Sequence, residues 1–140
     1  MTPVRKLIMA LSQQQMMLLQ GVRVWFGATF LMWAAQGVLP PTFGIIDGFT
    51  HVGAGFFGLI AAFACATGRS ANSRTWFANL WGLTDILIVA STLALVLLPT
   101  IGAHHPMMYA VFLPAPLWIC FHLMSMGRLL MGTSRAWTIP

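Results

Sequence analysis

Both acidic residues of this chain, Asp47 and Asp85, lie in apolar runs that are long enough to cross a lipid bilayer. A charged side chain at the bilayer centre costs about 2.5 kcal/mol or more on insertion scales, and such residues usually serve a function. The seven Lys and Arg residues, by contrast, are expected outside the middles of these runs. The carboxylates therefore predict an intramembrane site, with Asp85 as its first candidate.

Two histidines fall in the same kind of apolar run. His51 follows Asp47 by four residues, and Trp118 and His122 have the same spacing, so each pair shares one helix face. The helical rise places Asp47, His51, Asp85 and His122 at about 6, 12, 17 and 21 Å below the outer membrane edge. Because histidine titrates near neutrality, His and Asp side chains at such steps could pass protons.

Three further side chains complete the predicted site. Asn79 extends the polar set toward the cytoplasm, and Trp33 and Trp118 fall near the middle of the membrane. A buried indole N–H requires a hydrogen-bond partner, so these two residues are expected to wall a cavity, with packing alone as the alternative. The segment Pro114-Ala115-Pro116 interrupts an apolar run, and interrupted helices often border binding sites in membrane proteins, although a plain kink is the alternative.

The same residues allow a second kind of chemistry. His51, His122 and Asp85 could ligate a transition metal, and the two histidines could bind the iron of haem b from opposite faces. Their estimated depths differ by about 9 Å, however, which is awkward for one iron. The sequence contains no HxxxH, ExxH or CxxC metal pattern. It also lacks P-loop, Rossmann and GxSxG motifs, so we expect a protein that is not an enzyme.

The elements that must position these residues are membrane-spanning helices. The 140 residues are 59% hydrophobic and 6% charged, which leaves too few polar side chains to cover a soluble globule. Since a span needs about 20 apolar residues, this length predicts four spans and no folded extramembrane domain. The expected spans are residues 22–39, 42–66, 75–98 and 106–131, which together form one bundle over 22–131.

The two ends of the chain are expected outside the bundle. Residues 1–21 form an N-terminal segment, in which residues 7–19 could lie as an interfacial helix with the glutamines of positions 13–15 toward water. Residues 132–140 are expected to form a cytoplasmic tail.

The basic residues predict the orientation of the spans. They fall in three groups, before the first span, between the second and third, and after the fourth: Arg5, Lys6 and Arg23; Arg69 and Arg74; Arg128 and Arg135. Under the positive-inside rule, both termini are then cytoplasmic, and His104 and His105 lie at the outer face. The net charge of +5 comes from scattered residues rather than from one basic face, so we expect no nucleic-acid partner.

Three stretches of the chain carry a resemblance: RVWFGATFLMWAAQGVLPPTF (residues 23–43), NLWGLTDILIVASTLAL (79–95) and LPAPLWICFHLMSMGRLL (113–130). They resemble a group of small, functionally uncharacterised bacterial four-span membrane proteins. The matching positions are Arg23, Asn79, Asp85, Pro114, Pro116 and His122. The group's second span has Gly-x-x-Asp where this chain has Gly48 and His51, so an ionisable residue occurs in both. The resemblance implies the fold and topology but no activity.

We therefore expect an all-α, antiparallel four-helix transmembrane bundle in the bacterial cytoplasmic (inner) membrane. The small-xxx-small pair Gly44 and Gly48, together with spans that are apolar nearly all round, favours a homo-oligomer. The leading functional hypothesis is an intramembrane site centred on Asp85 and His122, which binds or translocates protons, a cation or a small solute. The alternatives are a haem or metal redox protein and a small accessory subunit of a larger membrane complex, in which the polar residues only join helices.

Overall fold

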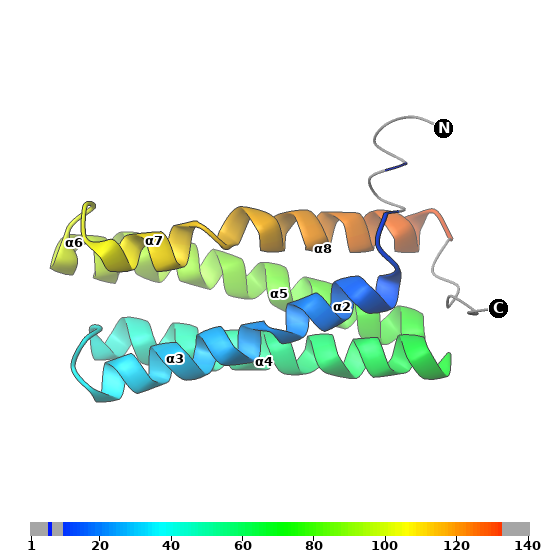
Figure 1. Ribbon diagram of the computed structural model, residues 1–140, viewed down its shortest axis with the longest axis horizontal. Helices are drawn as coiled ribbons and strands as arrows, with labels where there is room; N and C mark the ends of the chain where they lie inside the picture. Colours follow the sequence, from blue (N-terminus) through cyan, green and yellow to red (C-terminus); the bar gives the residue numbers. More distant parts are fainter. Residues whose placement is uncertain (1–5, 7–9, 133–140) are drawn as a thin grey trace.

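The computed structural model describes residue 6 and residues 10–132, and these residues contain helices and no strand (Figure 1). The described helices are α2 (Gln13–Gly21), α3 (Arg23–Ala35), α4 (Pro41–Thr67), α5 (Ala71–Thr92), the π-helix η1 (Leu93–Leu97), α6 (Leu98–Ile101), α7 (Pro106–Phe112) and α8 (Ala115–Leu130). The all-α prediction is confirmed for this part of the chain. Arg5, Arg135, the proposed tail beyond residue 132 and residues 7–9 of the proposed interfacial helix lie outside the described residues.

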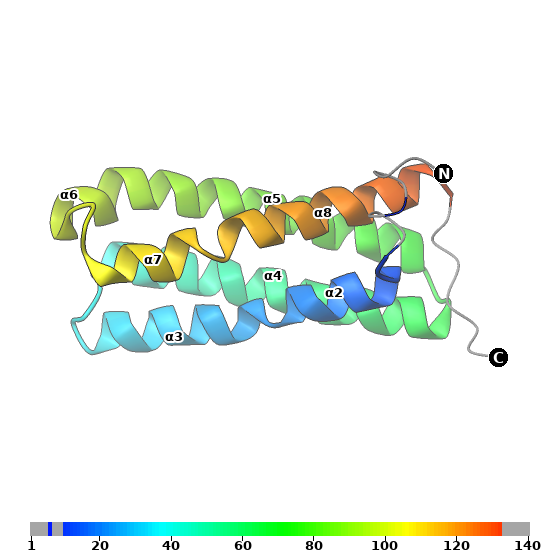
Figure 2. The ribbon, with the colours of Figure 1, turned by 45° about the horizontal axis from the view of Figure 1, so that its top comes forward.

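Three helical stretches are long and apolar enough to cross a membrane: Gln13–Ala35, Pro41–Thr67 and Ala71–Ile101. The helix α8 is apolar but shorter, with 16 residues. The connections from α3 to α4 and from α6 to α7 lie at one end of the molecule. The connection from α4 to α5 lies at the opposite end, with the start of α2 and the end of α8 (Figures 1 and 2).

The first helical stretch begins earlier than the residue pattern predicts. Ser12 caps α2, because its hydroxyl accepts a bond of 3.1 Å from the backbone N–H of Gln15 while the Gln15 side chain accepts one of 2.8 Å in return. Only Val22 separates α2 from α3, so the stretch begins at Gln13 rather than near Val22. The expectation that residues 13–15 all face water is wrong for Gln13, which is buried, whereas Gln14 and Gln15 are exposed.

The helix α4 is the central element, because it packs against α2 and α3 on one side and against α5 on the other. Glycines permit this close approach. A Cβ atom added at Gly48 would lie 2.6 Å from Leu31 Cγ, and one added at Gly27 would lie 2.7 Å from the backbone nitrogen of Val52. Gly44 similarly faces Phe30. The glycine stripe of α4 is thus covered within one chain, and it no longer argues for an oligomer.

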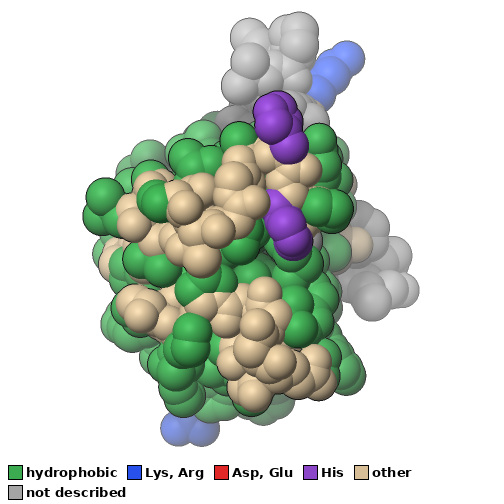
Figure 3. Space-filling model, turned by 90° about the vertical axis from the view of Figure 1, so that its left-hand side faces the viewer, with side chains coloured by type: hydrophobic (Ala, Val, Ile, Leu, Met, Phe, Trp, Pro, Cys, Tyr) green, Lys and Arg blue, Asp and Glu red, His purple; other side chains and the backbone are tan. Residues whose placement is uncertain are grey.

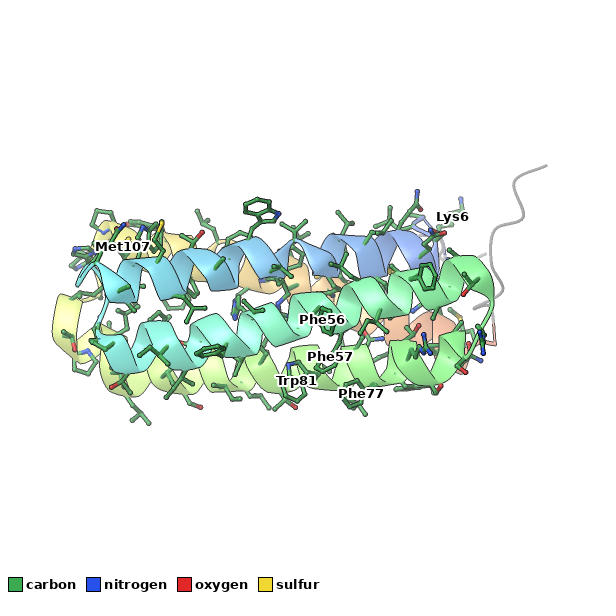
Figure 4. All side chains as sticks on the ribbon, turned by 90° about the horizontal axis from the view of Figure 1, so that it is seen from below. Lys6, Phe56, Phe57, Phe77, Trp81 and Met107 are labelled. Carbon is green, nitrogen blue, oxygen red and sulfur yellow. The ribbon has the colours of Figure 1, made fainter. Side chains whose placement is uncertain are left out.

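On the other side, aromatic rings join α4 to α5. The ring of Phe57 lies 4.8 Å from that of Phe77 and 5.1 Å from that of Trp81, measured between centroids, and both pairs meet edge to face. These rings and that of Phe56 gather on the outer side of the two helices (Figure 4). Such pairs add to the stability that apolar burial provides.

Two apolar clusters lie toward the two ends of the molecule. One contains Phe30, Phe43, Val89 and Leu97, near the end that carries α6 and α7; the other contains Met16, Met17, Ala61, Ala62 and Ala78. Each of the three longest helical stretches contributes to both clusters, so the segment between them is enclosed by apolar packing. This enclosed middle segment holds the polar side chains that the sequence singled out.

Candidate functional site

An ion pair between Arg23 and Asp85 forms the centre of the buried polar residues. Nη2 of Arg23 donates to Oδ2 of Asp85, and Nη1 lies 3.3 Å from the carbonyl oxygen of Gly82. The two charged residues are 0% and 1% exposed. The expectation that all basic residues lie outside the middles of the apolar runs is therefore wrong for Arg23. Because the helical stretch starts at Gln13, this arginine lies well inside it.

The two predicted histidines lie on either side of the ion pair. Nδ1 of His51 is 3.0 Å from Oδ1 of Asp85, and Nε2 of His122 is 3.0 Å from Nη1 of Arg23. The proposed midplane pair of Asp85 and His122 is thus bridged by the guanidinium. A Cβ atom at Gly82 would collide with the imidazole of His122, so only glycine lets this ring pack so closely on α5.

Asn79 and Ser125 extend the set of hydrogen bonds toward the start of α2. Nδ2 of Asn79 donates to Oγ of Ser125 at 2.6 Å and to the carbonyl oxygen of Thr75 at 2.9 Å. Gln13 also donates to the Ser125 hydroxyl. We call the whole hydrogen-bonded chain the buried network, and its members are Gln13, Ser125, Asn79, His122, Arg23, Asp85 and His51.

The hydrogen bonds determine which nitrogen of His122 carries the proton. The amide nitrogen of Asn79 is a donor to two oxygens, so its Oδ1 is the acceptor for Nδ1 of His122, 3.0 Å away. Nδ1 therefore carries the hydrogen, and Nε2 accepts from Arg23. A protonated His122 would direct a second N–H against the guanidinium, so the geometry requires the neutral ring.

His51 has the same tautomer for a different reason. The carboxylate of Asp85 can only accept, so Nδ1 of His51 donates to it. Arg23 already balances the charge of Asp85, and a second buried cation would be uncompensated. The buried network then contains one positive and one negative charge, and its net charge is zero.

The other aspartate does not join the buried network. Asp47 is 0% exposed, and its two carboxyl oxygens lie 2.8 and 2.7 Å from the hydroxyl of Thr92. Among residues 10–132, Thr92 is the only hydrogen-bond partner of the Asp47 carboxyl group, and the Thr50 hydroxyl donates to the backbone carbonyl of Asp47. The predicted ladder from Asp47 through His51 to Asp85 and His122 is therefore interrupted at its outer step.

A cavity of about 280 Å³ borders the buried network, between α3, α4, α5, η1, α7 and α8. Arg23 and His51 line it, and the remaining lining is apolar apart from the indole of Trp118. The break between α7 and α8, visible in Figure 2, supplies Pro114 and Ala115 to the wall. The structure thus places Trp118 at the cavity, whereas Trp33 lies outside it, beside Phe30.

Two of the side chains that line this cavity have unsatisfied donors. Nε1 of Trp118 and Nε of Arg23 are buried, and neither has a hydrogen-bond partner in the described part of the chain. Trp118 is 7% exposed. Buried N–H groups in folded proteins are nearly always paired. Nε2 of Gln20, away from this cavity, is a further buried donor without a partner among the described residues.

Metal and haem binding fit this arrangement poorly. Among the described residues, no group of three or more His, Cys, Asp or Glu side chains is placed to hold a metal ion. The reason is that the guanidinium of Arg23 occupies the position between His122 and Asp85. Coordination of one iron by His51 and His122 would require this ion pair to be displaced.

The exposed histidines lie far from this site. His104 and His105 are exposed in the connection between α6 and α7. The end face of the molecule shown in Figure 3 carries histidine side chains and no visible acidic one. Neither His104 nor His105 belongs to the buried network.

The predicted site left out three members of the buried network, Arg23, Gln13 and Ser125. The prediction assigned Arg23 to membrane orientation and Gln13 to the water-facing side of an interfacial helix. The signal that could have found Arg23 and Gln13 is the apolar character of residues 16–22, which continues the first run back toward the Ser12 cap.

The chain matches no curated protein and no solved structure. A family model described as a domain of unknown function matches residues 2–130, a range that includes every member of the buried network. The match agrees with the resemblance to an uncharacterised group, and it does not identify an activity. The chain belongs to the family "Domain of unknown function (DUF8737)".

Proposed function

We propose that this protein spans the bacterial cytoplasmic membrane four times, as an antiparallel bundle with both termini in the cytoplasm. Three candidate spans support this proposal, and α7 with α8 supplies a fourth apolar stretch over Pro106–Leu130. The exposed residues Arg69 and Arg74 lie in or next to the connection between α4 and α5, at the end where α2 starts and α8 ends. The positive-inside rule assigns that end to the cytoplasm.

Within this bundle, we propose an intramembrane site that binds or translocates a small solute. The single observation that carries the proposal is the cavity of about 280 Å³ that reaches both Arg23 and His51. Small-molecule sites are typically concave and mostly apolar, with a few convergent polar groups, and this cavity has that composition.

The contacts of the buried network argue against a cation or a simple proton pathway. Both oxygens of Asp85 are already engaged, one by Arg23 and one by His51, so the carboxylate is not free for a cation. Arginine keeps its proton at any physiological pH. Because Arg23 lies between His122 and Asp85, it interrupts a proton relay between the two histidines.

Native mass spectrometry of the protein in mild detergent tests this function. We expect a retained small molecule in the wild type and its loss in Ala90→Leu, which fills the cavity from α5. Ala66→Leu is the matched control, because Ala66 is exposed on α4 and does not line the cavity. The proposal would be contradicted if no molecule were retained, or if Ala90→Leu retained it equally. Either result would favour the alternative that the buried polar residues only hold the helices together.

A further inference from the structure

A groove on the outer side of α4 and α5 joins apolar walls to an exposed arginine. Its volume is about 180 Å³, and its lining consists of Phe57 and Ile60 of α4 with Ser73, Arg74 and Phe77 of α5. Phe77 is 50% exposed, and its ring meets that of Phe57 edge to face. Figure 4 shows both rings on the outer side of the two helices. The groove therefore offers apolar contact and one basic side chain to a molecule outside the bundle.

The basic and the apolar parts of this lining lie at different depths. Arg74 lies near the start of α5, which begins at Ala71 at the end proposed to be cytoplasmic. Phe77 and Trp81 follow Arg74 at spacings that keep them on one face of the helix, and this face covers about 10 Å toward the middle of the bundle. A molecule in the groove would thus have its polar part at the membrane surface and its apolar part in the hydrocarbon.

The charge beside the groove is positive, and no acidic side chain balances it. Arg69 and Arg74 are both exposed at this end of the molecule. The two acidic side chains of the chain are buried deeper in the bundle, and Asp85, the one on α5, lies about 16 Å beyond Arg74 along the helix. The positive end of the α5 helix dipole adds to the charge of Arg74. The groove therefore favours an anionic group.

These features select between possible occupants. A second copy of this chain in the same orientation would bring further arginines to this end and no acidic side chain, so like charges would meet. A neutral hydrocarbon would leave Arg74 uncompensated. The cytoplasmic leaflet contains anionic phospholipids, which attract basic residues close to the membrane surface. A phospholipid of this kind combines a phosphate with acyl chains, in the order of depth that the lining requires.

From these features we propose that the groove between α4 and α5 binds one anionic phospholipid. The phosphate accepts hydrogen bonds from the guanidinium of Arg74 at the membrane surface, while an acyl chain lies against Phe57, Ile60 and Phe77. This inference rests on the proposed spans and their orientation. It does not depend on the solute cavity, because no residue lines both the cavity and the groove.

Native mass spectrometry of the full chain in detergent tests the inference with two phospholipids that have identical acyl chains. Phosphatidylglycerol is anionic, whereas phosphatidylcholine has no net charge. From an equimolar mixture, we expect the wild type to retain one phosphatidylglycerol in preference to phosphatidylcholine. Arg74→Gln should lower this preference about 5-fold, since a basic residue near an anionic membrane surface contributes about that factor. Absence of any preference in the wild type would overturn the proposal.

Arg69→Gln is the matched control, because Arg69 is exposed at the same end and does not line the groove. It should keep most of the preference for phosphatidylglycerol. Equal losses in Arg69→Gln and Arg74→Gln would show a general attraction to a positive surface rather than a site, and would overturn the proposal.

The apolar wall is tested separately. Phe77→Ala removes an aromatic ring from the groove and should reduce retention of phosphatidylglycerol, whereas Phe56→Ala, at an exposed ring outside the groove, should not. Glycerol phosphate has the phosphate without the acyl chains, and we expect it not to displace the lipid at equal concentration. Displacement by glycerol phosphate, or equal retention by Phe77→Ala and the wild type, would show that the groove holds no acyl chain.

A wash of cell membranes with alkaline carbonate separates this inference from the proposal on which it rests. A chain that spans the membrane stays in the washed membranes. If the wash releases the chain, the proposed spans and the lipid site both fail. If the chain stays in the membrane and the purified protein shows no preference for phosphatidylglycerol, only the lipid site fails. Retention of a solute by the cavity, as measured with Ala90→Leu, is independent of either result.

Discussion

Asp47 and Asp85 are equally buried, yet their carboxyl groups have different hydrogen-bond partners. The carboxylate of Asp85 accepts from a guanidinium and an imidazole N–H, whereas the hydroxyl of Thr92 is the one partner of the Asp47 carboxyl group among the described residues. Thr92 has a single hydroxyl hydrogen, and its oxygen also lies 3.0 Å from the carbonyl of Ile88. If Thr92 donates to that carbonyl, its oxygen can accept a hydrogen bond from a neutral Asp47.

The comparison shows that burial alone does not determine what an intramembrane carboxyl group does. A buried charge needs a counter-charge and several donors, and only Asp85 has them. A neutral carboxylic acid needs an acceptor for its hydrogen, which the oxygen of the Thr92 hydroxyl can supply to Asp47. The two positions should therefore respond differently to the same substitutions.

The largest effect is expected for Arg23→Met, which leaves Asp85 as an unpaired buried charge. Breaking one partner of a buried ion pair costs about 3–5 kcal/mol, and we expect a loss of that size in unfolding free energy, measured by circular dichroism in detergent. Arg74→Met, which removes an exposed arginine, should leave the stability unchanged. The double variant Arg23→Met with Asp85→Leu should recover most of the loss; a single variant as stable as the wild type would contradict the central role of the pair.

The two Asp→Asn substitutions test the comparison directly. Asp85→Asn leaves Arg23 unpaired and should cost about 3 kcal/mol, whereas Asp47→Asn replaces one neutral group by another and should cost about 1 kcal/mol or less. Both unfolding free energies can be measured in the same detergent. Equal losses at the two positions would remove the distinction between a charged and a neutral aspartate.

A smaller loss of unfolding free energy is expected for Gly82→Ala, at the place where His122 packs on α5. Gly82→Ala forces a methyl group against the imidazole, and overpacking of this kind costs about 1–3 kcal/mol. Adding His122→Ala removes the collision, so the two losses should be clearly less than additive in a double-mutant cycle. Simple additivity of the two unfolding free energies would show that the ring does not lie against Gly82.

A loss of stability no larger than that of Gly82→Ala is expected at Thr92, the partner of the Asp47 carboxyl group. Thr92→Val removes the hydroxyl and keeps the shape of the side chain, which leaves the carboxyl group without its side-chain partner and should cost about 1–2 kcal/mol. Combined with Asp47→Leu, the loss should shrink. Thr29→Val is a matched control, because the Thr29 hydroxyl donates to the carbonyl of Trp25 in its own helix, and its removal should leave stability unchanged. Equal effects of the two threonine substitutions would show that Asp47 does not depend on Thr92.

The sequence by itself determined the helical class, the apolar stretches and a short list of polar residues that had to meet inside them. A polar side chain in an apolar run must find a partner, which is why Asn79, Asp85, His51 and His122 could be singled out without a structure. The same argument singled out Asp47, although the structure gives it a separate partner.

Only the tertiary structure decided which of these residues pair. Which residues pair depends on where each helix begins and on which neighbour each of its faces meets. The Ser12 cap begins the first helical stretch at Gln13, so Arg23 lies in the middle of that stretch and is buried. The tertiary structure also decided that Trp118, and not Trp33, borders the cavity that reaches Arg23 and His51, because the break at Pro114 lies on the Trp118 side of the bundle. Spacing along one helix predicts shared faces, whereas contacts between helices depend on packing that no single segment contains.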